Sequence, residues 1–259
     1  LALCLFILLN GTLALAQEEK EFLVPTIGSE LRIDGVGDEM EWNASVWQSD
    51  FWMWRPADSL QATKQTRFKF LRNEKNLFIL VESDADGTDF TTPNLKRDFS
   101  TYPTDYLTLL FDTFSDATNA FSFATNPIGL KADGLISGGN QSYRSDRNYA
   151  WDTKWTVATK ITEERFTAEI KIPFSAFFYD NSQTSWRFNL YRGNTQINET
   201  SSWIRTPLNQ TIGNLGFMGK MVFETPLKKA RNPISLIPYV SGATQKDFVE
   251  GTSGSNTSV

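Results

Sequence analysis

The sequence predicts an all-β protein that folds as an antiparallel β-sandwich. Aromatic residues make up 14% of the 259 residues, with 20 Phe and 8 Trp, and aromatic side chains favour strands. Apolar runs of strand length are separated by Gly, Asn, Asp and Pro at intervals of roughly 10 to 15 residues. Outside the short segment 174–180, no apolar stripe with a helical period is longer than about two turns. Short strands between regular turn signals are typical of two packed sheets.

Alternation of apolar and polar residues indicates which side chains form the core. Segment 76–83 is almost continuously apolar and is expected to be a central strand. Other strands are expected to turn one apolar face inward: Phe68 and Phe70; Leu107, Leu109 and Phe111; Phe121 and Phe123; Phe166, Ala168, Ile170 and Ile172; Trp186, Phe188 and Leu190. Four tryptophans share the parity of such apolar neighbours and are predicted to be buried: Trp42, Trp151, Trp155 and Trp186.

The first residues form an apolar run that turns polar at Gln17, after the small-x-small stretch Ala14-Leu15-Ala16. The run has the features of a Sec signal peptide, residues 1–16, whose basic start is missing. It is too short for a membrane-spanning helix, which needs about 20 residues. Cleavage would remove Cys4, the sole cysteine. We therefore expect an exported protein without disulfides, as in a bacterial envelope, with residues 17–29 as a lead-in segment.

Composition excludes several classes of chemistry. The chain contains no His, so Ser-His-Asp catalysis and His-ligated zinc sites are impossible. The net charge of -5 argues against a nucleic-acid partner, which would require a basic surface. Carboxylate chemistry, oxygen-ligated metals and binding through aromatic surfaces remain.

Four stretches together resemble a known family. They are RIDGVGDEMEW, RDFSTYPTDYLTLLFDTFSDATNAFSFATNPIGLKADG, WDTKWTVATKITEERFTAEIKIPF and WRFNLYRGNTQINETSSWIRTP. The order of the predicted strands and the turn residues between them resemble the family 9 carbohydrate-binding domain, in the form found at the N-terminus of bacterial outer-membrane proteins. The resemblance implies a sandwich over 30–225, a non-catalytic module that binds a polysaccharide or oligosaccharide and serves in polysaccharide use.

The same resemblance implies a second domain. Residues 226–233 would be a linker, and residues 234–259 would begin an incomplete outer-membrane β-barrel. The stretch ISLIPYVSGA has about the length of one membrane-spanning strand. The expected partners are then the protein's own barrel and the outer membrane, with the sandwich in the periplasm or at the cell surface.

Sugar-binding modules stack sugar rings on exposed aromatic faces, and Trp and Tyr combine a flat apolar ring with a polar group. The aromatic residues in polar surroundings are therefore the candidates. Trp52 and Trp54 share one face of a short stretch, Trp203 and Arg205 lie in the polar segment ETSSWIRTP, and Tyr149 lies in a polar loop. We expect these five residues to contact carbohydrate.

A structural calcium site is the expected cofactor. Asp84, Asp86 and Asp89 surround Gly87 at the end of the central strand, and closely spaced carboxylates around a turn can bind calcium through oxygen atoms. The dipeptide Asp-Gly is also a common turn signal without a metal.

Two other functions stay open. The sandwich could have lost sugar binding and instead dock on the barrel or another partner, since a fold does not determine its function. A glycosidase would need a pair of carboxyl groups with different pKa values. The strand residues Asp105, Asp112, Asp152 and Glu169 are the available acids, although an acid on the wet face of a strand is usually solvated.

Overall fold

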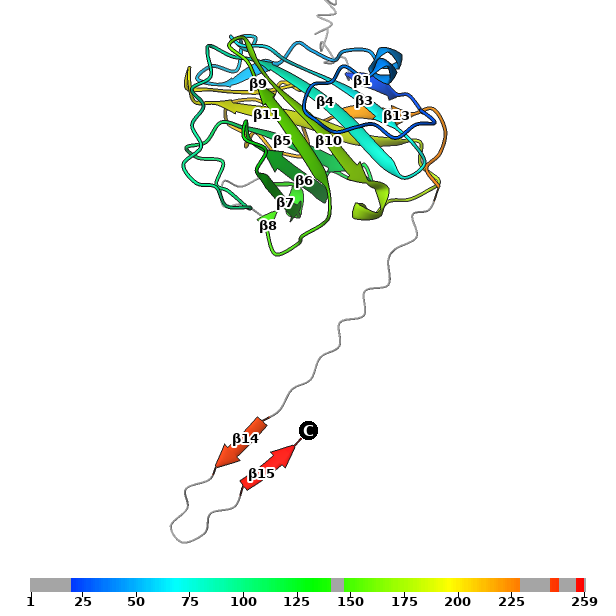
Figure 1. Ribbon diagram of the computed structural model, residues 1–259, viewed down its shortest axis with the longest axis vertical. Coiled ribbons are helices and arrows are strands. Elements are labelled where there is room, and N and C mark those ends of the chain that lie inside the picture. Colours follow the sequence, from blue (N-terminus) through cyan, green and yellow to red (C-terminus); the bar gives the residue numbers. More distant parts are fainter. Residues whose placement is uncertain (1–19, 141–146, 229–242, 247–254, 259) are drawn as a thin grey trace, which may run out of the picture.

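The computed structural model describes residues 20–140, 147–228, 243–246 and 255–258. Two β-sheets pack face to face (Figure 1). Over the described residues, the larger sheet contains nine strands: β1 (Glu21–Val24), β2 (Trp52–Arg55), β5 (Tyr106–Asp112), β6 (Ala120–Thr125), β7 (Lys131–Ile136), β8 (Arg147–Asn148), β11 (Ser185–Asn194), β12 (Glu199–Ser202) and β13 (Gly219–Phe223). The smaller sheet contains β3 (Thr66–Arg72), β4 (Asn76–Asp84), β9 (Thr156–Ile161) and β10 (Arg165–Pro173). The predicted β-sandwich is confirmed.

The larger sheet runs β1-β13-β11-β5-β6-β7-β8, with β12 beside β11 and β2 beside β12. The smaller sheet runs β3-β4-β10-β9. All pairs are antiparallel except β1 with β13, which are parallel, so the larger sheet is mixed and not purely antiparallel as expected. In the described part of the chain, three short 3-10 helices connect strands: η1 (Met40–Ala44), η2 (Gly138–Asn140) and η3 (Phe174–Ala176).

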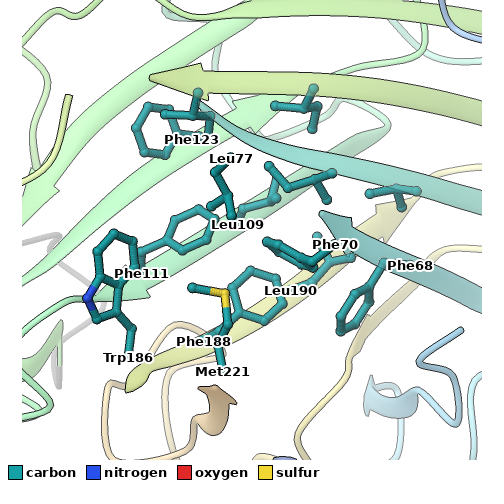
Figure 2. Packing of buried hydrophobic residues seen from close by; sticks show 14 of the residues in the cluster. Phe68, Phe70, Leu77, Leu109, Phe111, Phe123, Trp186, Phe188, Leu190 and Met221 are labelled. Atoms are coloured by element: carbon teal, nitrogen blue, oxygen red, sulfur yellow. The ribbon is translucent and has the colours of Figure 1, made fainter. Parts of the chain in front are cut away.

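The core lies between the sheets and consists of the side chains that the alternation indicated. Figure 2 shows Phe68 and Phe70 from the smaller sheet facing Phe111, Phe188 and Leu190 from the larger one. Their rings meet mostly edge to face, for example Phe70 and Phe188 with centroids 4.9 Å apart, a favourable geometry for aromatic pairs. Of the four tryptophans predicted to be buried, three are buried: Trp42, Trp155 and Trp186. The fourth, Trp151, is partly buried and packs against the core.

Strand β4 is apolar on both faces because both faces are covered. Leu77, Ile79 and Val81 point into the core, whereas Phe78 and Leu80 point to the other side of the smaller sheet. There they pack under residues 27–47, here called the cover segment, which contributes buried Leu31 and Trp42 among others. The central-strand prediction therefore agrees with burial on two sides.

The sandwich begins before residue 30. Strand β1 comes from the expected lead-in segment and pairs with β13 from Glu21↔Lys220 to Val24↔Phe223. The expected signal peptide lies outside the described residues, as do most of 226–233 and 234–259. The described pieces there, β14 (Ala243–Lys246) and β15 (Ser255–Ser258), pair only with each other. Within the described residues, no helix has the length and apolar character that crossing a membrane requires.

Candidate functional site

A cavity of about 540 Å³ opens at one end of the larger sheet. Its walls come from the end of β2, the loop before β5, and the β11–β12 hairpin. The lining residues are Trp54, Arg55, Pro56, Thr101, Tyr102, Pro103, Thr104, Tyr106, Gly193, Asn194, Thr195, Asn198, Glu199 and Thr200. A concave surface that combines aromatic rings with hydroxyl, amide and carboxylate groups is the usual form of a small-ligand site.

A β-bulge directs Trp54 into this wall. Thr200 pairs with Arg55 and Ser201 with Met53, so Trp54 has no partner in the ladder. Neighbouring side chains in a regular strand point to opposite faces, but an unpaired bulge residue allows two successive side chains to lie together. The Arg55 guanidinium accordingly lies 4.5 Å from the centre of the Trp54 ring.

Tyr102 supplies the most exposed aromatic surface of the cavity, with 85% of the residue accessible. Its loop is tied to the β11–β12 hairpin through buried Asp105. The Asp105 carboxylate accepts hydrogen bonds from the backbone N–H of Thr91 (2.7 Å) and of Thr195 (2.8 Å). Asp105 therefore joins the segment around Thr91 to the β11–β12 hairpin, and its two carboxylate oxygens already accept backbone hydrogen bonds.

Three buried donors of β2 and β11 have no hydrogen-bond partner within the described part of the chain: Trp54 Nε1, Asn194 Nδ2 and Arg192 Nη1. Trp54 and Asn194 belong to the lining itself. Burial lowers the pKa of Arg192 to about 10, against the raising effect of Asp105, Asp84 and Glu199, so the guanidinium stays charged at neutral pH. An unpaired buried donor costs about 1–3 kcal/mol, and a ligand with oxygen acceptors would relieve part of that cost.

Glu199 provides an acceptor among these donors. It is buried, lies opposite Asn194 in the β11–β12 ladder, and its carboxylate accepts the Thr63 N–H at 3.1 Å. The floor of the cavity thus offers amide and indole donors beside a carboxylate acceptor, a set suited to hydroxyl groups, which both donate and accept.

The five predicted sugar contacts are distributed unevenly. Trp54 lines the cavity but, against the expectation of an exposed ring, it is only 7% exposed. Trp52 is partly exposed beside it on β2, with Arg205 5.5 Å from its ring centre. Tyr149 is 46% exposed but is not in the lining. Trp203 is a correction, because it is 1% exposed and packs against Phe22 at 5.6 Å in the core, where no sugar can reach it.

Tyr102, Asn194 and Glu199 were not among the residues expected to contact carbohydrate. The signal for Tyr102 was a Tyr-Pro step inside the polar stretch RDFSTYPTD, which places an aromatic ring in a loop. Asn194 and Glu199 had no comparable signal, because their proximity depends on the pairing of two strands.

The predicted calcium ligands do not come together. Asp86 is paired with Lys64 at 2.5 Å, and Asp84 and Asp89 are both exposed. Among the described residues, the acidic group whose ligand atoms lie within 4.8 Å of one another is instead Asp34, Glu39 and Glu169. This partly buried triad could hold a metal ion.

Glu169 is the centre of that triad and lies under the cover segment. Its carboxylate accepts hydrogen bonds from the backbone N–H of Asp34 (2.9 Å) and Gly35 (2.8 Å), and from Trp42 Nε1 (3.3 Å). Burial raises the pKa of Glu169, and the neighbouring Glu39 raises it further, although the two backbone donors act in the opposite direction. The acid that the alternation placed on a wet face is in fact fully covered.

The acids considered for glycosidase chemistry do not form a pair. Asp112 ends β5 in the larger sheet, whereas Glu169 lies on β10 in the smaller sheet. Asp152 contacts Arg97 together with Asp133. Each of these carboxylates is engaged by separate partners.

Comparison with known families identifies the sandwich. The model of the "Carbohydrate family 9 binding domain-like" family matches residues 33–223, most of the chain. The chain belongs to this family. The match is to a family of binding domains and includes the cavity walls, the smaller sheet and all strands of the larger sheet except β1. No curated protein sequence matches the chain.

Solved structures of family 9 modules share the fold. A family 9 module from Caldicellulosiruptor kristjanssonii in complex with glucose aligns with a TM-score of 0.53 at 15% identity, covering 83% of this chain and 100% of that one. The complex with cellotriose aligns with a TM-score of 0.52 at 15% identity, covering 85% and 100%. A candidate carbohydrate-binding protein from Bacteroides uniformis aligns with a TM-score of 0.62 at 12% identity, covering 80% and 100%. At these identities the likeness concerns the fold.

Proposed function

We propose that this protein is a non-catalytic carbohydrate-binding module and that the cavity between Trp54 and Tyr102 is its sugar site. Family membership and the glucose and cellotriose bound by structures of the same fold support the ligand class. The single observation that carries the location is the cavity itself, where aromatic rings lie beside unpaired buried donors.

The chemistry of the cavity suits a sugar better than an apolar ligand. Sugar rings present C–H groups that stack on aromatic faces, and Tyr102 offers such a face to solvent. Sugar hydroxyls would pair with Asn194 and Trp54 as acceptors and with Glu199 as donors. An apolar ligand would leave those buried polar groups unpaired and would bind more weakly.

The test is titration calorimetry with glucose, cellotriose, xylose and xylotriose. Replacing Tyr102 by Ala removes the exposed ring and should weaken binding about ten-fold or more, equivalent to about 1.4 kcal/mol, without lowering stability, because the side chain is mostly in solvent. Tyr149→Ala is the matched control, an exposed aromatic outside the lining that should leave affinity unchanged. Absence of binding to the whole panel, or an equal loss in both variants, would rule out the assignment.

We also propose that the protein is exported through Sec and acts in a bacterial envelope, as the N-terminal domain of an outer-membrane protein used in polysaccharide capture. The support is the apolar start, the small-x-small stretch before Gln17 and the absence of any cysteine after Cys4. N-terminal sequencing of the protein from its native cells should begin at Gln17. An uncleaved N-terminus would contradict export by this route.

A further inference from the structure

Two tryptophans of β2 each carry a stacked arginine. Arg55 lies 4.5 Å from the Trp54 ring centre, and Arg205 lies 5.5 Å from the Trp52 ring centre. Trp54 and Arg55 line the cavity, whereas Trp52 and Arg205 lie beyond it on the same strand and on a neighbouring segment.

Both pairs lie on the same face of the larger sheet. Trp52 is opposite Ser202 and Arg55 is opposite Thr200, and residues two apart on β12 point to one face. Met53 is opposite Ser201 and points to the other face, while Trp54, at the bulge, is buried beside Arg55. Thr200 and Ser202, the partners of Arg55 and Trp52, are two residues apart on β12, an advance of about 6.6–6.8 Å that is comparable with the length of a sugar residue. A chain bound in the cavity could therefore continue over Trp52.

A third pair, between β3 of the smaller sheet and the cover segment, is held by an ion pair as well as by stacking. Arg67 lies 4.3 Å from the Trp47 ring centre, but its guanidinium also forms an ion pair of 2.6 Å with Glu82. In contrast, no carboxylate among the described residues lies within 4.0 Å of the Arg55 or Arg205 guanidinium. Arg205 donates from Nε to the Asp58 carbonyl at 2.7 Å. Its terminal nitrogens have no ion-pair partner to satisfy them.

We propose that Trp52 and Arg205 form a second sugar subsite outside the cavity, so that the protein selects chains of two or more sugar residues over single sugars. The proposal rests on the proposed function, because it assumes that the first sugar occupies the cavity. Trp52 supplies a partly exposed aromatic surface, and the exposed Arg205 supplies donors to sugar hydroxyls at its edge.

The experiment compares a monosaccharide with its trimer: glucose with cellotriose, and xylose with xylotriose, measured by titration calorimetry. Wild-type protein should bind the trimer of its preferred sugar about ten-fold more tightly than the monosaccharide. Trp52→Ala and Arg205→Ala should reduce this ratio to near one and leave monosaccharide affinity unchanged. Trp47→Ala, which removes a partly buried Trp of the cover segment from the matched pair with Arg67, should preserve the ratio. Circular dichroism melting confirms that each variant is folded.

The outcomes separate the two proposals. Equal affinities for monosaccharide and trimer, or a ratio that survives both the Trp52 and Arg205 substitutions, overturn the second subsite but leave the cavity assignment intact. Arg205 is exposed, so its variant keeps the test valid even if Trp52→Ala fails to fold. Absence of binding to all four sugars overturns the cavity assignment and the second subsite with it.

Discussion

Asp112 shows how single buried carboxylates hold turns in this sandwich. It ends β5 with no exposed surface, and its oxygens accept hydrogen bonds from the backbone N–H of Ala117 (2.8 Å) and Phe114 (3.2 Å). Ser115 and Ala117 have φ of 57° and 56°, a left-handed conformation that costs non-glycine residues about 1–2 kcal/mol each. The carboxylate offsets this strain by fixing the turn.

Stability should depend on the protonation of Asp112. Burial raises its pKa above the ordinary 3.8, despite the backbone donors. The folded protein therefore binds the Asp112 proton more tightly than the unfolded chain does. Above the raised pKa the charged carboxylate destabilises the folded state. This destabilisation disappears as the pH falls towards 3.8. The free energy of unfolding of the wild type, relative to that of Asp112→Asn, should increase as the pH is lowered from about 7 to 4. Urea titrations across this range measure it, and a constant or shrinking difference contradicts it.

At the scale of elements, the contribution of β1 to the larger sheet could not be predicted from the sequence. It has only four residues, Glu21–Val24, and its place beside β13 depends on a parallel pairing nearly 200 residues away. It nevertheless inserts Phe22 and Val24 into the core, where the ring centroids of Phe22 and Phe68 are 5.5 Å apart. Short-range alternation cannot reveal such a partner, and the family resemblance placed the start of the sandwich at residue 30.

A chain that begins at residue 30 should be markedly less stable than one that begins at residue 20. Loss of two buried apolar side chains removes about 1.5–3 kcal/mol each, and β13 would lose a hydrogen-bonded neighbour. We expect a decrease of at least about 3 kcal/mol in the free energy of unfolding, visible as a lower urea midpoint. Similar midpoints for the two chains would show that β1 is an accessory strand.

At the scale of the whole molecule, alternation and turn signals predict the sandwich and most of its core, because inward and outward faces of a strand are local properties. The site was only partly predictable. Trp203 looked accessible in its polar segment but is buried, since a bend turns its ring between Phe22 and Phe188. Glu169 looked solvated, yet the cover segment, distant in sequence, lies over it. Contacts made across sheets are invisible to a pattern of short range.

A metal ion at the acidic triad would connect the cover segment to the smaller sheet. Asp34 and Glu39 belong to it and Glu169 to β10, so an ion held by the three carboxylates would join the cover to the smaller sheet. We expect calcium, the ion anticipated from the sequence, to raise the melting temperature and a chelator to lower it. At a free calcium concentration a hundred times the Kd, binding would add about 2.7 kcal/mol to the free energy of unfolding.

Two variants distinguish this triad from the acidic turn. Glu169→Gln retains an oxygen for the backbone donors of Asp34 and Gly35 but lacks the charge that binds calcium, so its melting temperature should no longer respond to the ion. Asp86→Asn alters the turn that the sequence favoured and should respond like the wild type. If calcium leaves the wild type unchanged, Glu39 and Glu169 do not hold it, and the raised pKa of Glu169 then favours a carboxyl pair that shares a proton beneath the cover segment.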